Sequence, residues 1–328
     1  MATNGVHLLE PLQTPVMIVT RGQVTYANPA ARDLLGSHIV GQDVRIAIRD
    51  PKAVAAILSD EGGAARISGL SVGSSVWEVD CRITGPHERM VSLYDLSVPV
   101  SVARAHADFV ANASHELRTP LANVLGYVET LLDPRAGGDK ATRERFLETI
   151  RHEAQRMQAL VSDLMSLSRI EAVKHEVPSG TVDLVRVAQE VVSESGASGR
   201  VSLSANCEIA NVAGDRGQLA QVLRNLVDNA LKYGKVDGRV TVTIEAAATG
   251  WVLISVHDEG EGIPPEHLPR LTERFYRADT SRSRAAGGTG LGLSIVKHIV
   301  ERHRGRFDIA SRPGSGTTAS MILPLRGA

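Results

Sequence analysis

The feature that most constrains the fold is a pair of seven-residue repeats within residues 98–172. In the first repeat, small or apolar residues recur at steps of four and three: Val110, Ser114, Leu117, Leu121, Val124, Val128 and Leu131. In the second repeat, nearly the same spacing joins Phe146, Ile150, Met157, Leu160, Leu164 and Leu167. This spacing places a narrow apolar seam along one side of an α-helix. We therefore expect two long helices, separated by the turn-rich stretch Asp133–Asp139.

Two antiparallel helices with such narrow seams bury little apolar surface by themselves. When two hairpins pack side by side, they form a four-helix bundle in which all the seams are covered. We therefore expect a homodimer formed through residues 98–175. The alternative is a monomeric hairpin whose seams pack against a neighbouring domain of the same chain.

The first 97 residues have the pattern of a small α/β module. Two short apolar runs, 15–20 and 23–27, flank Arg21-Gly22 and predict a β-hairpin. Asn28-Pro29 is typical of a helix start, with asparagine as the cap and proline in the first turn. Gly36 is then expected to end this helix.

Two further strands are expected later in the same module. Ser75–Ile83 alternates between polar and apolar residues, which is the period of a half-buried strand. Its apolar side consists of Trp77, Val79, Cys81 and Ile83. Arg89–Leu96 is the second strand candidate.

The last part of the chain, residues 176–328, mixes strands, helices and glycine-rich loops. Arg239–Ala246 and Trp251–Asp258 alternate and are rich in β-branched residues, whereas Gly217–Tyr233 and Leu291–Arg304 are amphipathic helices. This mixture predicts an α+β or α/β sandwich. The chain is thus expected to be a multidomain α+β protein, divided into residues 1–97, 98–175 and 176–328.

Composition narrows the class of protein. A length of 328 residues suggests two or three domains. A formal net charge of -1 gives no overall attraction to nucleic acid or to an anionic membrane. The two cysteines, Cys81 and Cys207, lack the spacing of a zinc site. With neither a long apolar run nor a signal-peptide pattern, the expectation is a cytoplasmic protein with no membrane span and no direct nucleic-acid binding.

His115 stands apart from the other histidines because it lies just off the first helical seam. The residues that share its face are polar or small: Asp108, Asn112, Arg118, Thr119 and Ala122. We therefore expect the imidazole to face solvent on a rigid helix, where it can act as a nucleophile. A carboxylate that accepts the ring's second N–H would fix its tautomer, and Glu116 is the nearest one. Adjacent residues do not face each other on a helix, so spacing alone does not assign that role to Glu116.

Pro120 lies inside the same helical pattern, one turn beyond His115. It lacks a backbone N–H and crowds the carbonyl group of Glu116, so it predicts a bend. The bend would be either a hinge for switching or a tolerated kink.

Three segments of the last domain have the chemistry of a nucleotide site. Asn225 and Asn229 share one helix face, where amide oxygens can bind Mg²⁺, although a plain polar face is the alternative. The stretch Asp258–Gly262 follows a strand, and its carboxylate can accept a hydrogen bond from an adenine amine. Gly287–Gly292 opens a helix whose free N–H groups can bind phosphate. The preceding Ala278–Ala286 contains two arginines that could cover phosphates.

Other nucleotide-binding signatures are absent. The chain has neither a P-loop motif nor the glycine spacing of a dinucleotide-binding fold. It also lacks the catalytic and metal-binding motifs of the serine/threonine and tyrosine protein kinases.

The segment Phe109–Leu121, which reads FVANASHELRTPL, resembles the phospho-acceptor motif of sensor histidine kinases. The resemblance implies that His115 accepts a phosphoryl group. It also implies that Glu116 is the base of that step, and that Thr119 helps to position water when the partner protein is dephosphorylated.

The segments around residues 225–233, 258–262, 273–277, 287–292 and 314–317 together resemble the ATP-binding domain shared by histidine kinases, gyrase B, Hsp90 and MutL. The resemblance implies ATP and Mg²⁺ as cofactors, with Asn229 on the metal, Lys232 on phosphate, and Tyr233 and Asp258 on adenosine. The residues that it assigns to nucleotide binding are Asn225, Asn229, Lys232, Tyr233, Asp258, Gly260, Gly262, Phe275, Gly288, Gly290, Leu291, Gly292 and Thr317.

Val24–Ala31 resembles part of a PAS sensory domain, as found in phosphate-regulon kinases. The combined resemblance implies a PAS α/β sensor, a dimeric four-helix-bundle phospho-acceptor domain and an α/β-sandwich ATP-binding domain. The resemblance implies a sensor histidine kinase that phosphorylates itself at His115. It then transfers the phosphoryl group to an aspartate in the receiver domain of a response regulator. It also has phosphatase activity towards the phosphorylated regulator.

Two alternatives to the kinase remain at this point. An ATPase clamp of the gyrase/Hsp90 class uses a catalytic glutamate on the helix that bears the metal-binding asparagine. In this chain the position four residues before Asn229 is occupied by Asn225 and not by a glutamate. Sustained ATP hydrolysis that is independent of His115 would favour the clamp. The other alternative is a sensory adaptor whose kinase site is inactive.

Overall fold

The structure is a computed structural model of the chain. The residues that it describes are 6–70, 75–133, 139–173, 176–196, 199–206, 210–247, 250–278 and 288–326. The chain forms two compact units, Met1–Ala111 and Asn112–Ala328, which are described separately. No described helix is both long and apolar enough to cross a membrane.

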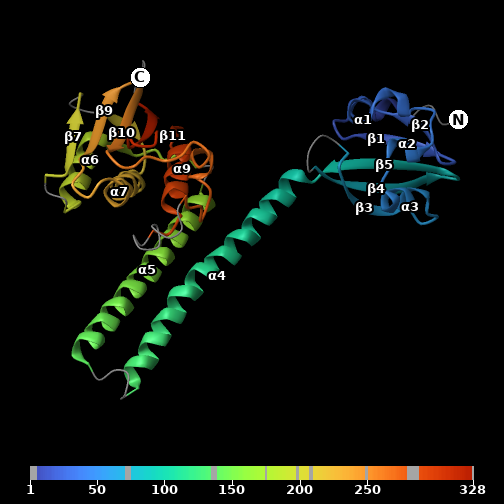
Figure 1. Ribbon diagram of the computed structural model, residues 1–328. Coiled ribbons are helices and arrows are strands. Elements are labelled where there is room, and N and C mark those ends of the chain that lie inside the picture. The colour runs from blue at the N-terminus through green and yellow to red at the C-terminus, as the bar shows by residue number, and fades with distance from the viewer. Residues whose placement is uncertain are drawn as a thin grey trace. The chain divides into compact units, whose positions relative to one another are not determined.

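The first unit is built on a five-stranded antiparallel sheet in the order β2-β1-β5-β4-β3 (Figure 1). The strands are β1 (Val16–Thr20), β2 (Gln23–Ala27), β3 (Gly63–Ser68), β4 (Val76–Gly85) and β5 (Glu88–Asp95). The helices are α1 (Pro29–Leu35), α2 (Val44–Ala47) and α3 (Pro51–Leu58), with 3-10 turns η1 (Val6–Leu8) and η2 (Ser37–Ile39). The helices and one face of the sheet enclose a common apolar core.

The hairpin between β1 and β2 confirms the sequence prediction. Arg21 and Gly22 both have positive φ angles, +53° and +82°, which is the backbone geometry of the tight turns that match strand twist. Asn28 caps α1 as predicted, and its side chain is fully buried. Its Oδ1 accepts hydrogen bonds from the backbone N–H groups of Val16 and Ala31, both at 2.9 Å. Asn28 thus ties the start of β1 to the start of α1.

Strand β4 confirms the alternation for Trp77, Val79 and Cys81, which are all buried in the core. Ile83 differs, because the residue is 50% exposed. Arg82, Ile83 and Thr84 are all exposed, so β4 leaves the core after Cys81, and its pairing with β5 shifts register only beyond Ile83. The apolar side of the sequence pattern is therefore one residue longer than the buried side of the strand.

Two long helices, α4 (Ser97–Leu132) and α5 (Lys140–Ala172), confirm the predicted hairpin. Helix α4 begins in the first unit and continues through Pro120 without interruption. A bend at Pro120 stays a prediction. Residues 134–138 of the expected turn lie outside the described residues.

The C-terminal part of the second unit has a five-stranded sheet in the order β11-β12-β10-β9-β7. Its strands are β7 (Val201–Ala205), β9 (Val240–Ala246), β10 (Trp251–Asp258), β11 (Arg306–Ser311) and β12 (Thr317–Pro324). A two-stranded sheet pairs β6 (Thr181–Asp183) with β8 (Asn211–Ala213). The helices are α6 (Leu184–Glu194), α7 (Arg216–Tyr233) and α9 (Gly292–Arg302), and η3 (Leu268–Arg270) is a 3-10 turn.

These helices cover one face of the larger sheet, which confirms the predicted sandwich (Figure 1). The alternate residues Val240, Val242, Ile244, Val252, Ile254 and Val256 point into the core and are essentially unexposed. The C-terminal half of α5 also packs on this domain, next to α9, and buries Leu167 and Ile170. As a result, helix α5 of the hairpin lies next to the segments that the sequence assigned to nucleotide binding.

Candidate functional site

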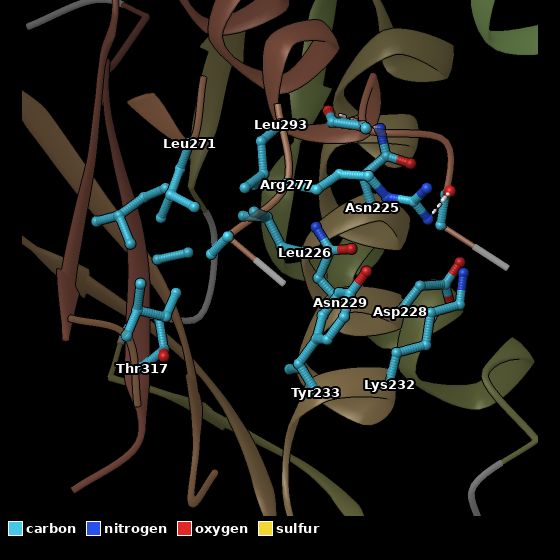
Figure 2. Close-up of a pocket in the computed structure, with 18 of the residues that line it drawn as sticks. Asn225, Leu226, Asp228, Asn229, Lys232, Tyr233, Leu271, Arg277, Leu293 and Thr317 are labelled. Carbon is cyan, nitrogen blue, oxygen red and sulfur yellow. Dashed lines mark hydrogen bonds between the residues drawn. The ribbon is translucent and has the colours of Figure 1, made fainter. Parts of the chain in front are cut away.

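A cavity of about 520 Å³ opens between α7, the start of α9 and the strands β10 and β12. It brings together most of the residues that the sequence assigned to nucleotide binding: Asn225, Asn229, Lys232, Tyr233, Asp258, Gly262, Gly288, Gly290, Gly292 and Thr317. In Figure 2, the labelled side chains of α7 form one wall, while Leu271 and Thr317 lie on the opposite side. The cavity therefore has a polar helical wall and a more apolar side.

The polar wall follows from the spacing of α7. Asn225 and Asn229 are one turn apart and both line the cavity, as predicted. The Asn225 amide nitrogen donates a hydrogen bond to the carbonyl oxygen of Gly292 at 3.3 Å, which fixes the side chain against α9. Its amide oxygen is then the atom available to a ligand. Amide oxygens suit a hard cation such as Mg²⁺, which takes only a few protein ligands and completes its shell with phosphate oxygens and water.

Asp258 stands at the end of β10, where the residue is only 8% exposed. Its Oδ1 accepts a hydrogen bond from the backbone N–H of Gly260 at 2.8 Å. Burial raises the pKa of the Asp258 carboxyl, and hydrogen bonds from the backbone of Gly260 and Thr317 partly offset that rise. The carboxylate is therefore held in place, at the edge of a cavity large enough for a nucleobase.

Glycines shape the backbone around this carboxylate. Gly260 does not line the cavity, and a Cβ there would come within 2.6 Å of the Asp258 Oδ1. Gly262 has a φ angle of +74°, and a Cβ would lie 2.0 Å from the carbonyl oxygen of Arg312. At Gly316, which precedes β12, the same atom would lie 1.9 Å from the carbonyl oxygen of Asp258. These positions allow two loops to pack beneath the site.

Phe275 and Leu291 do not line the cavity either. The side chain of Leu291 is fully buried at the start of α9. The backbone N–H of Phe275 donates a hydrogen bond to the carbonyl oxygen of Gly290 at 2.9 Å. The two residues thus belong to the framework that holds Gly288–Gly292 in place. Gly287 and the predicted basic stretch Arg282–Arg284 lie outside the described residues.

His115 is exposed on α4, as the seam pattern predicted. The Thr119 hydroxyl donates a hydrogen bond to the backbone carbonyl oxygen of His115 at 3.4 Å. Glu116 lies on a different side of the helix, where its carboxylate accepts a hydrogen bond from Arg156 Nη2 of α5 at 3.0 Å. The same carboxylate lies 4.0 Å from Arg277 Nη1. Glu116 is therefore paired with two arginines, which the sequence did not indicate.

Several cavity residues were missed by the reasoning from sequence. Asp228 and Arg277 lie inside the segments that carried the resemblance, but no role was assigned to them. Arg277 Nη2 donates a hydrogen bond to the carbonyl oxygen of Gly288 at 2.5 Å. Ala159 and Asp163 come from α5, far from every nucleotide segment in the sequence. Nothing in the local pattern of α5 signals that these two residues face a cavity.

Comparison with known protein families divides the chain into three matched regions. Residues 214–327 match the family described as Histidine kinase-, DNA gyrase B-, and HSP90-like ATPase. Residues 105–173 match the His Kinase A (phospho-acceptor) domain. Residues 7–69 match the PAS domain family. The three matches follow the order that the sequence predicted.

Individual relatives agree with these regions. The phosphate regulon sensor protein PhoR of Pseudomonas aeruginosa is 36% identical over 316 residues, covering 92% of this chain and 70% of that protein. The sensor-like histidine kinase SenX3 of Mycobacterium tuberculosis is 34% identical over 303 residues, covering 90% of this chain and 68% of that one. The sensor histidine kinase WalK of Bacillus subtilis is 36% identical over 239 residues, which are 71% of this chain and 39% of that one.

Among solved structures, the Acinetobacter baumannii histidine kinase AdeS has a TM-score of 0.50 and 23% identity. The match covers 65% of this chain and 98% of that one. It supports the fold.

Proposed function

This chain belongs to the sensor histidine kinases, a family of protein-histidine kinases, and we propose that it phosphorylates its own His115 with Mg²⁺-bound ATP. We also propose that the phosphoryl group then moves to an aspartate of a response regulator receiver domain. Membership of this family favours the kinase over the ATPase clamp. ATP is supplied in the cytoplasm, so we propose that these domains work there.

The observation that carries the proposal is the cavity that gathers the predicted polar residues of α7 and β10 beside the hairpin that bears His115. In this proposal, the buried Asp258 carboxylate accepts a hydrogen bond from the adenine amine, and Tyr233 lies along the adenosine. Lys232 and the N-terminal end of α9 bind the phosphates, because free backbone N–H groups and a positive charge both attract anions.

Asn229 is proposed as the metal ligand, with Asn225 beside it. When bound, Mg²⁺ would neutralise negative charge on the phosphates as the phosphoryl group is transferred. The chain's own contribution is to hold the nucleotide in line with the imidazole and to exclude water, since phosphoryl transfer needs little covalent help from the protein.

The transfer step forms a bond between one imidazole nitrogen of His115 and the γ-phosphorus, and breaks the bond from that phosphorus to the oxygen bridging to the β-phosphate. ADP leaves with that oxygen. We propose that Glu116 accepts the proton of the other ring nitrogen, which requires it to leave at least one arginine partner. Thr119 is proposed to orient water in the phosphatase reaction, which requires its hydroxyl to turn away from the helix backbone.

We further propose a homodimer through residues 98–175. Several large apolar side chains on the helical hairpin are substantially exposed: Val110, Leu121, Leu125, Val128, Leu147, Val161 and Met165. A surface of this kind, repeated along two helices, supports a partner of the same type. The domain boundaries at residues 97 and 175 also remain part of the proposal.

Phosphotransfer to isolated receiver domains tests the complete reaction. The chain is first labelled with radioactive ATP, freed of nucleotide and mixed with a receiver domain. The label should leave the kinase and appear on an aspartate of the receiver. If the labelled chain keeps its phosphoryl group with every receiver domain of the source organism, the proposed partner class is wrong. If the chain never acquires label, the inactive-adaptor alternative holds.

A further inference from the structure

An acidic side chain of the helical hairpin reaches into the nucleotide cavity. Asp163 belongs to α5, yet it lines the cavity together with Ala159, which precedes it by one helical turn. Its Oδ2 accepts a hydrogen bond from the hydroxyl group of Thr289 at 2.7 Å. Thr289 lies between Gly288 and Gly290, at the start of α9. The hairpin thus places a carboxylate against the segment proposed to bind phosphates.

The carboxylate of Asp163 interacts with Thr289 and Lys232, the residues at the proposed phosphate end of the cavity. Lys232, the residue proposed to contact phosphate, attracts the carboxylate electrostatically. Even so, the pKa of Asp163 is raised, because burial penalises the charged form more than Thr289 and Lys232 favour it. A phosphate group near the same two residues would lie close to a second anion in a partly buried site, where repulsion is stronger than in water.

A second carboxylate repeats the arrangement on the other helix of the hairpin. Glu116 of α4 lies 4.0 Å from Arg277, and Arg277 lines the cavity. Both helices therefore place a carboxylate next to a cavity-lining residue that carries hydrogen-bond donors. Side-chain carboxylates of the hairpin thus approach two donor-bearing residues of the cavity wall, Thr289 and Arg277.

Contacts outside the cavity hold α5 in this position. The Ser166 hydroxyl donates a hydrogen bond to Gln221 Oε1 at 3.0 Å, and Glu171 forms an ion pair with Arg274. The Arg302 guanidinium donates a hydrogen bond to the carbonyl oxygen of Val173 at 3.2 Å. Because these contacts do not involve the cavity, docking of α5 and the charge of Asp163 can be perturbed separately.

We propose that Asp163 is a specificity-determining residue that disfavours ATP relative to ADP while α5 is docked on the ATP-binding domain. The inference rests on the proposed function in one respect, namely that the phosphates lie at Lys232 and Gly288–Gly292. Because binding effects are reciprocal, ATP then disfavours docking of α5 to the same degree that docking disfavours ATP. Any signal that shifts α5 would change the affinity of the chain for ATP more than its affinity for ADP.

The test compares nucleotide affinities of the full chain and of Asp163→Asn, measured by calorimetry with ATP, ADP and adenosine in the presence of Mg²⁺. Asparagine keeps the size of the side chain and an oxygen that can accept from Thr289, but it removes the charge. We expect the ratio of the ATP dissociation constant to the ADP dissociation constant to fall by about tenfold, as for one unit charge near the terminal phosphate. Adenosine affinity should not change.

Glu148→Gln is the matched control, because Glu171 pairs with Arg274 and its substitution would itself loosen the docking of α5. This variant also removes one carboxylate from α5, but Glu148 is exposed, pairs with Arg151 of the same helix and does not line the cavity. The control should leave the ATP-to-ADP ratio at the wild-type value. Circular dichroism of all three proteins shows whether each one is folded, and Asp163→Ser serves as a second neutral variant if Asp163→Asn fails to fold.

Three results would overturn the inference. An unchanged ratio in folded Asp163→Asn would show that the charge does not reach the phosphates. Weaker ATP binding in that variant would mean that Asp163 supports the nucleotide or its metal. An equal change in Glu148→Gln would assign the effect to the total charge of α5 and not to the position of Asp163. Failure of the wild-type chain to bind any nucleotide would instead refute the proposed function, and the inference with it.

Discussion

Asp258 should be needed for nucleotide binding through its charge and for folding through its hydrogen bonds, and two substitutions separate these roles. Its carboxylate accepts hydrogen bonds from the backbone of Gly260 and Thr317. Asp258→Ala would leave the N–H groups of buried Gly260 and half-buried Thr317 without that acceptor, at about 1–3 kcal/mol each. We therefore expect a loss of about 2–6 kcal/mol in the free energy of unfolding.

Asp258→Asn keeps the shape of the side chain and an oxygen acceptor. Burial already penalises the charge of Asp258, so the neutral amide should leave stability close to that of the wild type. A hydrogen bond from adenine to a charged acceptor is worth about 1.5–3 kcal/mol, so ATP affinity should fall by about 10- to 100-fold.

The assay is calorimetric titration with ATP, together with denaturant unfolding of each variant. Asp237→Asn is the control, because Asp237 is an exposed acidic residue outside the cavity. It should match the wild type in both measurements. If folded Asp258→Asn binds ATP as tightly as the wild type, the adenine assignment is wrong.

Three further predictions concern other parts of the chain. Asn28→Ala should destabilise the first unit by about 3 kcal/mol or more, because several backbone groups lose their hydrogen-bond partner. The fluorescence of Trp77 in a Trp251→Phe background reports the unfolding of this unit. A loss of less than about 1 kcal/mol in the free energy of unfolding would contradict the prediction. Burial lowers the pKa of His303 from its ordinary 6.5, so the folded state binds fewer protons than the unfolded state, and stability should fall as pH drops below 6.5 and stay constant above it. His303→Gln should lose that pH dependence in denaturant titrations, and an unchanged slope would refute the assignment. Leu125→Asp should convert a dimer into monomers in sedimentation experiments, because Leu125 is 53% exposed on the hairpin, and an intact dimer would place the interface elsewhere.

Local patterns predicted those parts of the fold that local chemistry determines. The hairpin at Arg21-Gly22 and the cap at Asn28 follow from turn and capping preferences within a few residues. The long helices follow from the seven-residue spacing, and α7 follows from its amphipathic pattern. The predicted asparagines met in one cavity because helical periodicity places residues four apart on the same face.

Contacts between distant segments could not be predicted in this way. Asp163 has no special place in the periodic pattern of α5, and its position in the cavity depends on how that helix docks on α9. The pairing of Glu116 with Arg156 likewise depends on the packing of α4 against α5. Ile83 is exposed because β4 extends beyond the core after Cys81, which alternation alone does not reveal.

Labelling with ATP tests the central claim most directly. The wild-type chain and His115→Gln are incubated with ATP that is radioactive at the γ-phosphate, and the proteins are then separated and treated with acid or alkali. The wild type should acquire label that acid removes and alkali does not, as expected for a phosphorus–nitrogen bond, and His115→Gln should acquire none. Equal labelling of folded His115→Gln, or label that survives acid, would contradict the assignment of His115 as the phospho-acceptor.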